Sequence, residues 1–171
     1  MMRWRRLATL GLCLAGTVAC SRAPRSGPVE PVHTFGRADS PIAASGVAAD
    51  EGGWRIRRAD SGTVPLFEVT PPGGLEQVVL TYRARMKAEN LAGKAYLEMW
   101  VRVPGRGEFF SRGLAQPLTG TSGWASYEIP FFLNEKGIRA DLVKLSVAFE
   151  GGGSARVLID CTSRPYSATR M

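Results

Sequence analysis

Residues 78–103 carry the pattern that most constrains how this chain can fold. In residues 78–88 the even positions are apolar or nearly so, and the odd positions are mostly polar or charged. After a break at 90–93 the alternation resumes, now with apolar residues at the odd positions of 95–103. A period of two over this length is typical of strands that bury one face of a sheet. The sequence therefore predicts two long strands here, followed by the start of a third near Phe110.

Shorter stretches of strand-like sequence follow one another at a spacing of about ten residues. They are separated by turns, for which the chain provides 20 Gly and 11 Pro. Pro130 has no N–H to donate to a ladder, so its strand is expected at a sheet edge. The spacing predicts an all-β fold, an antiparallel β-sandwich or jelly roll of eight or nine strands. Besides the long pair, we expect strands at 54–58, 64–70, 108–112, 124–132, 142–150 and 155–160, with loops at 119–123 and 134–141.

The N-terminus has the features of a targeting segment. Arginines at positions 3, 5 and 6 precede an apolar run at 7–19 that is too short to span a bilayer. The residues that follow, Ala19-Cys20, resemble the lipobox of bacterial lipoproteins, which implies that Cys20 is lipidated and becomes the first residue of the mature chain. Ser21 after the cysteine implies the outer membrane as the destination. The alternative is an ordinary secretory signal that is cleaved near Ala19.

Four regions follow from these patterns. We expect a signal peptide at 1–19, a lipidated Cys20 and Pro-rich tether at 20–50, a jelly-roll domain at 51–162 and a flexible tail at 163–171. His33, the only histidine, lies in the expected tether, although 47–49 could begin a first short strand.

The charge distribution argues against nucleic acid as a partner. Three of the 22 basic residues and none of the 15 acidic residues lie in the signal segment, so the formal net charge of the remaining chain is +4. Its basic residues are scattered and interleaved with acidic ones, which is typical of a solvated surface. If Cys20 is lipidated, Cys161 is the one remaining thiol and is expected to be a small packing residue.

Catalysis is not expected from the residues available. The expected domain contains no histidine, which excludes a Ser-His-Asp or Cys-His arrangement unless His33 folds back onto it. Paired carboxylates remain possible, but no closely spaced cluster of acids occurs on one strand. A hydrolase therefore survives as a third hypothesis that depends on carboxylate geometry, with four candidate acids: Glu98, Glu108, Glu128 and Glu150.

The best candidate for a binding site is the polar face of 94–103. Tyr96, Glu98, Trp100 and Arg102 share that face, and Arg112 on the next strand could join them. An indole beside a carboxylate and a guanidinium suits a polyol, because the ring packs on C–H groups and the charged groups bind hydroxyls. The alternative is that Trp100 is covered and Glu98 is paired to Arg102 or Arg112. Trp54 and Trp124, each at the start of a strand, are expected in the core.

Six segments resemble a family of uncharacterised bacterial domains whose pattern is similar to galactose-binding-like jelly rolls. They are LFEV at 66–69, LTYRARMKAENLAGKAYLEMW at 80–100, PGRGEFFSRGL at 104–114, GTSGW at 120–124, EIPFFL at 128–133 and EGGGSARVLID at 150–160. The resemblance covers residues 54–160 and implies the architecture of many carbohydrate-binding modules. It also implies a possible structural calcium at Asp160, with Asp50 or Glu51 as further ligands.

Together these features predict a non-catalytic lipoprotein of the bacterial cell envelope that binds a glycan through its jelly-roll domain. The expected partners are the membrane, through the lipid, and a glycan or an envelope protein. No other cofactor is expected besides the possible calcium. The alternative is a structural or protein-interaction module that uses a sheet edge or an apolar patch and has no sugar site.

Overall fold

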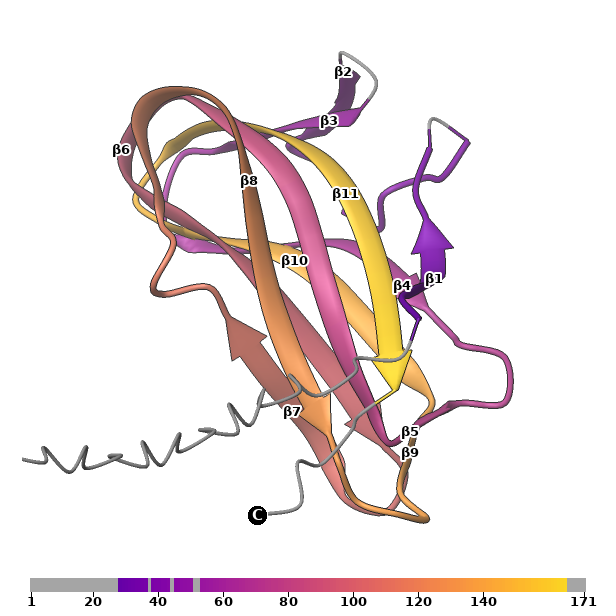
Figure 1. Ribbon diagram of the computed structural model, residues 1–171. Coiled ribbons are helices and arrows are strands. Elements are labelled where there is room, and N and C mark those ends of the chain that lie inside the picture. Colours follow the sequence, from indigo (N-terminus) through magenta and orange to yellow (C-terminus); the bar gives the residue numbers. More distant parts are fainter. Residues whose placement is uncertain (1–27, 37, 44, 51–52, 166–171) are drawn as a thin grey trace, which may run out of the picture.

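The chain folds into an all-β structure, as the alternation predicted (Figure 1). The computed structural model describes residues 28–36, 38–43, 45–50 and 53–165, with side chains described as far as Arg156. The strands are β1 (Glu30–Thr34), β2 (Val47–Asp50), β3 (Gly53–Arg58), β4 (Gly62–Val69), β5 (Leu75–Glu76), β6 (Val78–Val103), β7 (Gly107–Arg112), β8 (Leu118–Leu133), β9 (Arg139–Ala140), β10 (Leu142–Glu150) and β11 (Gly153–Pro165).

Nine of these strands form one antiparallel sheet, which agrees with the predicted eight or nine. The two-residue strands β5 and β9 pair with each other, and β9 lies within 134–141, where a loop was expected. The edge predicted from Pro130 is confirmed, since β8 pairs with β6 alone and Pro130 lies opposite Thr81.

Strand β6 organises the sheet because it changes partners along its length. Its first part, 78–89, pairs with β11 on one side and β8 on the other. Its last part, 94–103, pairs with β10 and β7. The sheet thereby curls into two halves (Figure 1). The first half-sheet consists of β1, β2, β3, β11, β8 and the first part of β6, and the second half-sheet of β4, β10, β7 and the last part of β6.

Residues 90–93 bend β6 where the sequence predicted a break between two strands. Asn90 has a positive φ of 52°, and the pairing with β8 shifts register three times between Met86 and Lys94. The loop expected at 119–123 is likewise part of β8, which follows the bend. The prediction of two separate strands was therefore wrong, because irregular pairing with β8 carries the ladder through residues whose side chains break the alternation.

The two half-sheets enclose one apolar core. The residues of β6 that face it are even-numbered in the first part and odd-numbered in the last part, as the change of phase in the sequence predicted. Trp54 is buried and packs edge-on against Phe67, with ring centroids 4.8 Å apart, so the core position expected for Trp54 is confirmed.

The described part of the expected tether forms strands instead. β1 pairs with β11, β2 pairs with β3, and Phe35 packs against Phe67 at a centroid distance of 4.4 Å. At the other end β11 continues to Pro165, into the expected tail. Residues 1–27, including the predicted signal peptide and Cys20, lie outside the described residues. Among those that are described, no helix is long and apolar enough to cross a membrane.

Candidate functional site

The outer face of the second half-sheet brings together polar and aromatic side chains from four strands. On β6 these are the even residues from Tyr96 to Arg102, whose side chains point away from the core because the odd residues fill it. Three rows of residues lie side by side on β10, β6 and β7: Ser146, Glu98 and Arg112; Lys144, Trp100 and Phe110; and Leu142, Arg102 and Glu108. The predicted face therefore exists, and β4 extends it beyond β10.

Glu98 is at the centre of this face and is only 2% exposed. Its Oε2 accepts hydrogen bonds from the Nε and Nη2 of Arg112, the first at 2.7 Å, which makes a charge-assisted ion pair. Its Oε1 accepts one from the Trp100 indole at 3.0 Å and a longer one from the Thr63 hydroxyl at 3.4 Å. The carboxylate is thus occupied by protein donors, and its pairing with Arg112 is one of the two alternatives that the sequence left open.

Trp100 is half-buried and lines a hollow of about 320 Å³. One side of its ring faces Phe110, whose centroid is 5.0 Å away and which is 58% exposed. We call this space the Trp100 hollow; the other residues lining it are Ile42, Thr63, Pro65, Phe67, Glu68, Glu108, Lys144 and Ser146.

The walls of the Trp100 hollow combine apolar and charged groups. Lys144 and Glu108 form an ion pair with 2.6 Å between Nζ and Oε1. Glu68 is exposed and belongs to the same lining, as do the hydroxyl-bearing Thr63 and Ser146. An apolar floor with a few polar groups around it is the usual composition of a site for a small molecule.

Tyr96 and Arg102 lie at the two ends of the face and are bonded elsewhere. The Tyr96 hydroxyl donates to Glu150 at 3.0 Å, and burial, followed by this bond, raises the pKa of the tyrosine. Arg102 donates to both oxygens of Asp141, at 2.8 and 3.1 Å, and this pairing raises the pKa of Arg102 and lowers that of Asp141. The structure thus brings Glu98, Trp100 and Arg112 together, but of the five predicted residues only Trp100 lines the hollow.

The outer face of the first half-sheet is basic, an arrangement that the sequence analysis missed. Six cations share this face because they occupy matching positions on three neighbouring strands: Arg55 and Arg57 on β3, Arg156 on β11, and Arg83, Arg85 and Lys87 on β6. We call it the arginine face. Alternation places Arg83, Arg85 and Lys87 on one side of β6, and only the cross-strand register shows that the cations of β3 and β11 join them.

Trp124 lies on the arginine face rather than in the core, so the expected core position was wrong. It is half-buried, with the Lys87 ammonium 5.1 Å and the Arg85 guanidinium 5.7 Å from its ring centroid. The neighbouring Ala125 is the residue opposite the buried Met86. Trp124 therefore points to the opposite, outer side, where cations over the aromatic ring stabilise it.

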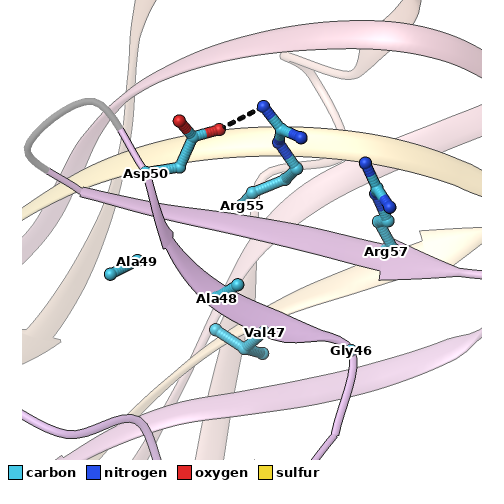
Figure 2. Close-up of a pocket in the computed structure, with 7 residues that line it drawn as sticks. All are labelled: Gly46, Val47, Ala48, Ala49, Asp50, Arg55 and Arg57. Atoms are coloured by element: carbon cyan, nitrogen blue, oxygen red, sulfur yellow. Dashed lines mark ion pairs between the residues drawn. The ribbon is translucent and has the colours of Figure 1, made fainter.

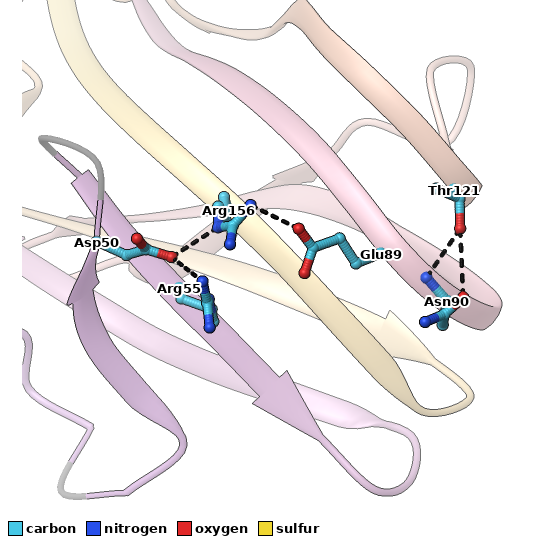
Figure 3. Close-up of polar contacts among 6 residues, drawn as sticks. All are labelled: Asp50, Arg55, Glu89, Asn90, Thr121 and Arg156. Atoms are coloured by element: carbon cyan, nitrogen blue, oxygen red, sulfur yellow. Dashed lines mark hydrogen bonds and ion pairs between the residues drawn. The ribbon is translucent and has the colours of Figure 1, made fainter.

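A chain of ion pairs crosses the arginine face from β2 to β6 (Figure 3). The Oδ2 of Asp50 lies 2.6 Å from both the Nη2 of Arg55 and the Nε of Arg156. Arg156 also reaches Glu89, with 2.5 Å between Nη1 and Oε1. These guanidinium groups, Arg156 foremost, hold the pKa of Asp50 below its usual value.

A hollow of about 350 Å³ lies beside this chain of ion pairs (Figure 2). Residues 46–50 form one wall, and Arg55 and Arg57 project from the same side of β3 along the other. Asp50 is bonded to Arg55 at its edge.

Of the three predicted calcium ligands, the structure describes the side chain of Asp50 alone. Asp50 is occupied by two guanidinium groups, Glu51 lies outside the described residues, and Asp160 is placed only by its backbone, opposite Arg83. In the part of the chain that is described, no three acidic, histidine or cysteine residues form a group that could hold a metal ion. His33 is in β1, where its Nε2 is 3.1 Å from Asp39 Oδ1.

Each of the four candidate acids has a partner of another kind. Glu98 is paired with Arg112 and Glu108 with Lys144, while Glu128 is paired with Arg83 and Glu150 accepts from Tyr96. Carboxylates held in this way balance charge or stabilise cross-strand pairs.

No protein-family model matches the chain, and a search of curated proteins finds no match. Solved structures with a similar arrangement include carbohydrate-binding modules. The xylan-binding module CBM15 aligns over 84% of this chain and 99% of its own length, at 15% identity and a TM-score of 0.48. The module TmCBM61, solved with beta-1,4-galactotriose, aligns over 66% and 71%, at 16% identity and a TM-score of 0.41. An apo cyclase from Fischerella sp. aligns over 90% and 81%, at 11% identity and a TM-score of 0.48. At such values the likeness concerns the all-β fold alone.

Proposed function

We propose that this chain is a non-catalytic binding module that holds a glycan in the Trp100 hollow. The observation that carries the proposal is the half-buried indole of Trp100, fixed at its Nε1 by Glu98 and stacked against the exposed Phe110. A sugar ring presents C–H groups to an aromatic surface, and its hydroxyls bond to charged groups at the rim.

The buried carboxylate of Glu98 serves in this proposal as a positioning residue. It is too deeply buried to touch a ligand, but its bonds to the Trp100 indole and to Arg112 keep both side chains in place. A platform that is ordered before binding loses less side-chain entropy when the ligand arrives. Direct contacts come from Trp100 and from the rim, where Glu68, Glu108 and Lys144 are the groups with charge.

Glycan-array binding of the purified chain, wild type beside three variants, tests the proposal. Trp100→Ala and Glu68→Gln are expected to weaken binding of the selected glycan at least about tenfold, because each removes a direct contact. Glu135→Gln, an exposed carboxylate paired with Arg106 away from the hollow, is the control and should bind as the wild type does.

Glu68 is exposed, so Glu68→Gln is expected to remain folded even if Trp100→Ala does not. Binding unchanged in a folded Glu68→Gln variant and in Trp100→Ala would contradict the proposed site. No binding by wild type across neutral and acidic glycans would contradict the proposed function.

The proposal includes attachment to the bacterial cell envelope through Cys20. Its support is the sequence alone: the basic and apolar segment ahead of Ala19-Cys20. Lipid attached at Cys20 would hold the domain at a membrane surface. Metabolic labelling with a fatty-acid analogue in a bacterial host should mark the wild-type chain, and Cys20→Ser should abolish the label; label retained by the variant would rule out that anchor.

A protein-interaction module is the second candidate, favoured by one apolar surface. Phe109 and Phe132 are 45% and 57% exposed and line a small hollow of about 140 Å³ with Phe131 and Ile138. Exposed apolar patches can mark sites of protein association. Analytical ultracentrifugation of the wild type and of the Phe132→Ser variant distinguishes the two candidates. Self-association of the wild type that is lost in the variant would favour the protein-interaction module over the glycan-binding module.

A further inference from the structure

The arginine face has more positive charge than its own carboxylates neutralise. Among the side chains that the structure describes, three carboxylates share this face with the six cations: Asp50, Glu89 and Glu128. Asp50 and Glu89 balance Arg55 and Arg156, and Glu128 balances Arg83. Asp160, opposite Arg83 in the register, could contribute a fourth carboxylate. The balance is positive in either case.

Arg57 and Arg85 are the cations with charge to offer a ligand. Both are exposed, and within the described part of the chain neither has a carboxylate partner; Arg85 lies over the Trp124 ring. Arg57 borders the hollow of about 350 Å³ beside residues 46–50 and a second hollow of about 480 Å³. A guanidinium group at such a position can form two parallel hydrogen bonds to a carboxylate or sulfate.

The spacing of these two arginines requires an extended ligand. Arg57 on β3 lies opposite Ser154 of β11, which lies opposite Glu89 of β6, and Arg85 is four residues from Glu89 on β6. Strand spacing and rise place the two positions about 10 Å apart across the strands and about 13 Å apart along them. One small anion cannot reach both, whereas an oligomer with repeated anionic groups can.

Two polar groups beside Arg57 are suited to hydroxyls. Ser154 lines the second hollow, and its Oγ is buried without a hydrogen-bond partner among the described residues. Asn90 lines the same hollow. A buried hydroxyl without a partner costs free energy that a ligand hydroxyl can recover.

We propose that the arginine face binds an acidic polysaccharide, whose carboxylates or sulfates pair with Arg57 and Arg85. A lipid surface fits less well because, of the six large exposed apolar residues of the described chain (Val29, Ile42, Phe109, Phe110, Leu114 and Phe132), only Phe132 is placed on this side of β8 by the register, four residues beyond Glu128. A nucleic acid fits less well because the Trp124 ring already lies against Arg85 and Lys87, which leaves less of it for base stacking.

The test is binding of the purified chain to polygalacturonate, dextran sulfate and uncharged dextran at low and moderate salt. The double variant Arg57→Gln/Arg85→Gln should bind the acidic polymers about tenfold more weakly than wild type. Wild-type binding should weaken as salt rises, and uncharged dextran should not bind through this face. The matched control is Arg106→Gln, an exposed arginine of the β6–β7 turn, which should behave as wild type.

Several outcomes would overturn the inference. They are equal binding by wild type and the double variant, absence of binding to both acidic polymers at low salt, and tighter binding to single-stranded DNA or to phosphatidylserine vesicles than to either polymer. The inference is independent of the Trp100 hollow, since Trp100→Ala should leave polyanion binding unchanged. The two proposals can therefore be refuted separately, because each depends on a different variant and a different ligand.

Discussion

Glu98 shows how a residue singled out by the sequence can have a different role from the expected one. A carboxylate beside an indole suggested a group that binds hydroxyls, but the side chain is buried and its oxygens accept from Arg112, Trp100 and Thr63. Its importance to a ligand is therefore indirect, through the side chains that it holds.

Replacing Glu98 should destabilise the fold more when more of its hydrogen bonds are lost. Glu98→Ala leaves the Trp100 indole and Arg112, which is 31% exposed, without their acceptor and should cost about 3 kcal/mol in the free energy of unfolding. Glu98→Gln keeps an oxygen for the indole and should cost about half as much. Urea unfolding measures both; two variants within about 0.5 kcal/mol of wild type would show that the bonds contribute little.

Asp50 should make the stability of the chain depend on pH in the acid range. Bonding to Arg156 and Arg55 lowers the folded-state pKa of Asp50 below its ordinary value of 3.8. Its contribution is therefore fully present above that value and is lost as the pH falls through the lower folded-state pKa. The difference in Tm between wild type and Asp50→Asn should shrink between pH 6 and pH 3, whereas a constant difference would contradict this role.

At the scale of the element, the bend in β6 depends on a glycine. A Cβ on Gly93 would lie 1.6 Å from the carbonyl oxygen of Glu150, because the bend packs against the turn between β10 and β11. The amide N–H of Ala92 donates to the Gly152 carbonyl at 2.9 Å in the same contact. The backbone of the bend is in direct contact with the backbone of the turn, and moving either one would break hydrogen bonds of the sheet.

Gly93→Ala should therefore destabilise the chain by at least about 2–3 kcal/mol, since the new methyl group forces the turn away from β6. Gly123→Ala is the matched control, because no heavy atom lies within 4 Å of the position of its Cβ. It should change the free energy of unfolding by less than about 0.5 kcal/mol. Equal midpoints of urea unfolding for the two variants would contradict the close contact between Gly93 and the Glu150 carbonyl.

The sequence predicted the regular parts of these elements and missed what depends on pairing between them. Alternation alone identified the buried faces of β6, because burial on one side of a sheet imposes that period. It could not show that β8 carries the ladder through 90–93. For the same reason it misplaced Trp124: without the register against β6, a tryptophan at the start of a strand is as compatible with the core as with a face of cations.

At the scale of the whole molecule, the described part of 28–50 belongs to the folded domain. It contributes β1 and β2, and Phe35 extends the aromatic packing of Phe67 and Trp54. Its proline, glycine and serine content is typical of a linker. It is nevertheless part of the sheet, because β2 pairs with β3 and β1 pairs with β11, which is more than a hundred residues away in sequence. No local pattern reveals pairing at that separation.

Phe35→Ala tests this assignment. The half-buried ring packs against Phe67, so its loss should lower the free energy of unfolding by about 2 kcal/mol. Val29→Ala changes a residue of the same segment that is 61% exposed and should have almost no effect. If both variants have the same free energy of unfolding as wild type, residues 28–50 are a tether and not part of the folded domain.

The candidate sites were likewise predictable within one strand and not predictable where they depend on pairing between strands. The sequence placed Tyr96, Glu98, Trp100 and Arg102 on one face, but the Trp100 hollow also needs β4, β10 and β7, which supply Glu68, Lys144 and Glu108. Nothing in the spacing of those residues along the chain brings them together. The arginine face was hidden for the same reason, since its cations come from three strands that are distant in sequence.

The central claim is that a glycan occupies the Trp100 hollow, and the indole N–H signals in a nitrogen-15 NMR titration test it most directly. The described chain has three tryptophans in different settings: Trp54 in the core, Trp124 on the arginine face and Trp100 beside the hollow. When the oligosaccharide that binds best in the array is added, the Trp100 signal should shift and saturate while those of Trp54 and Trp124 stay in place. A shift at Trp124 without one at Trp100, or an unmoved Trp100 signal at saturating ligand, would contradict the account.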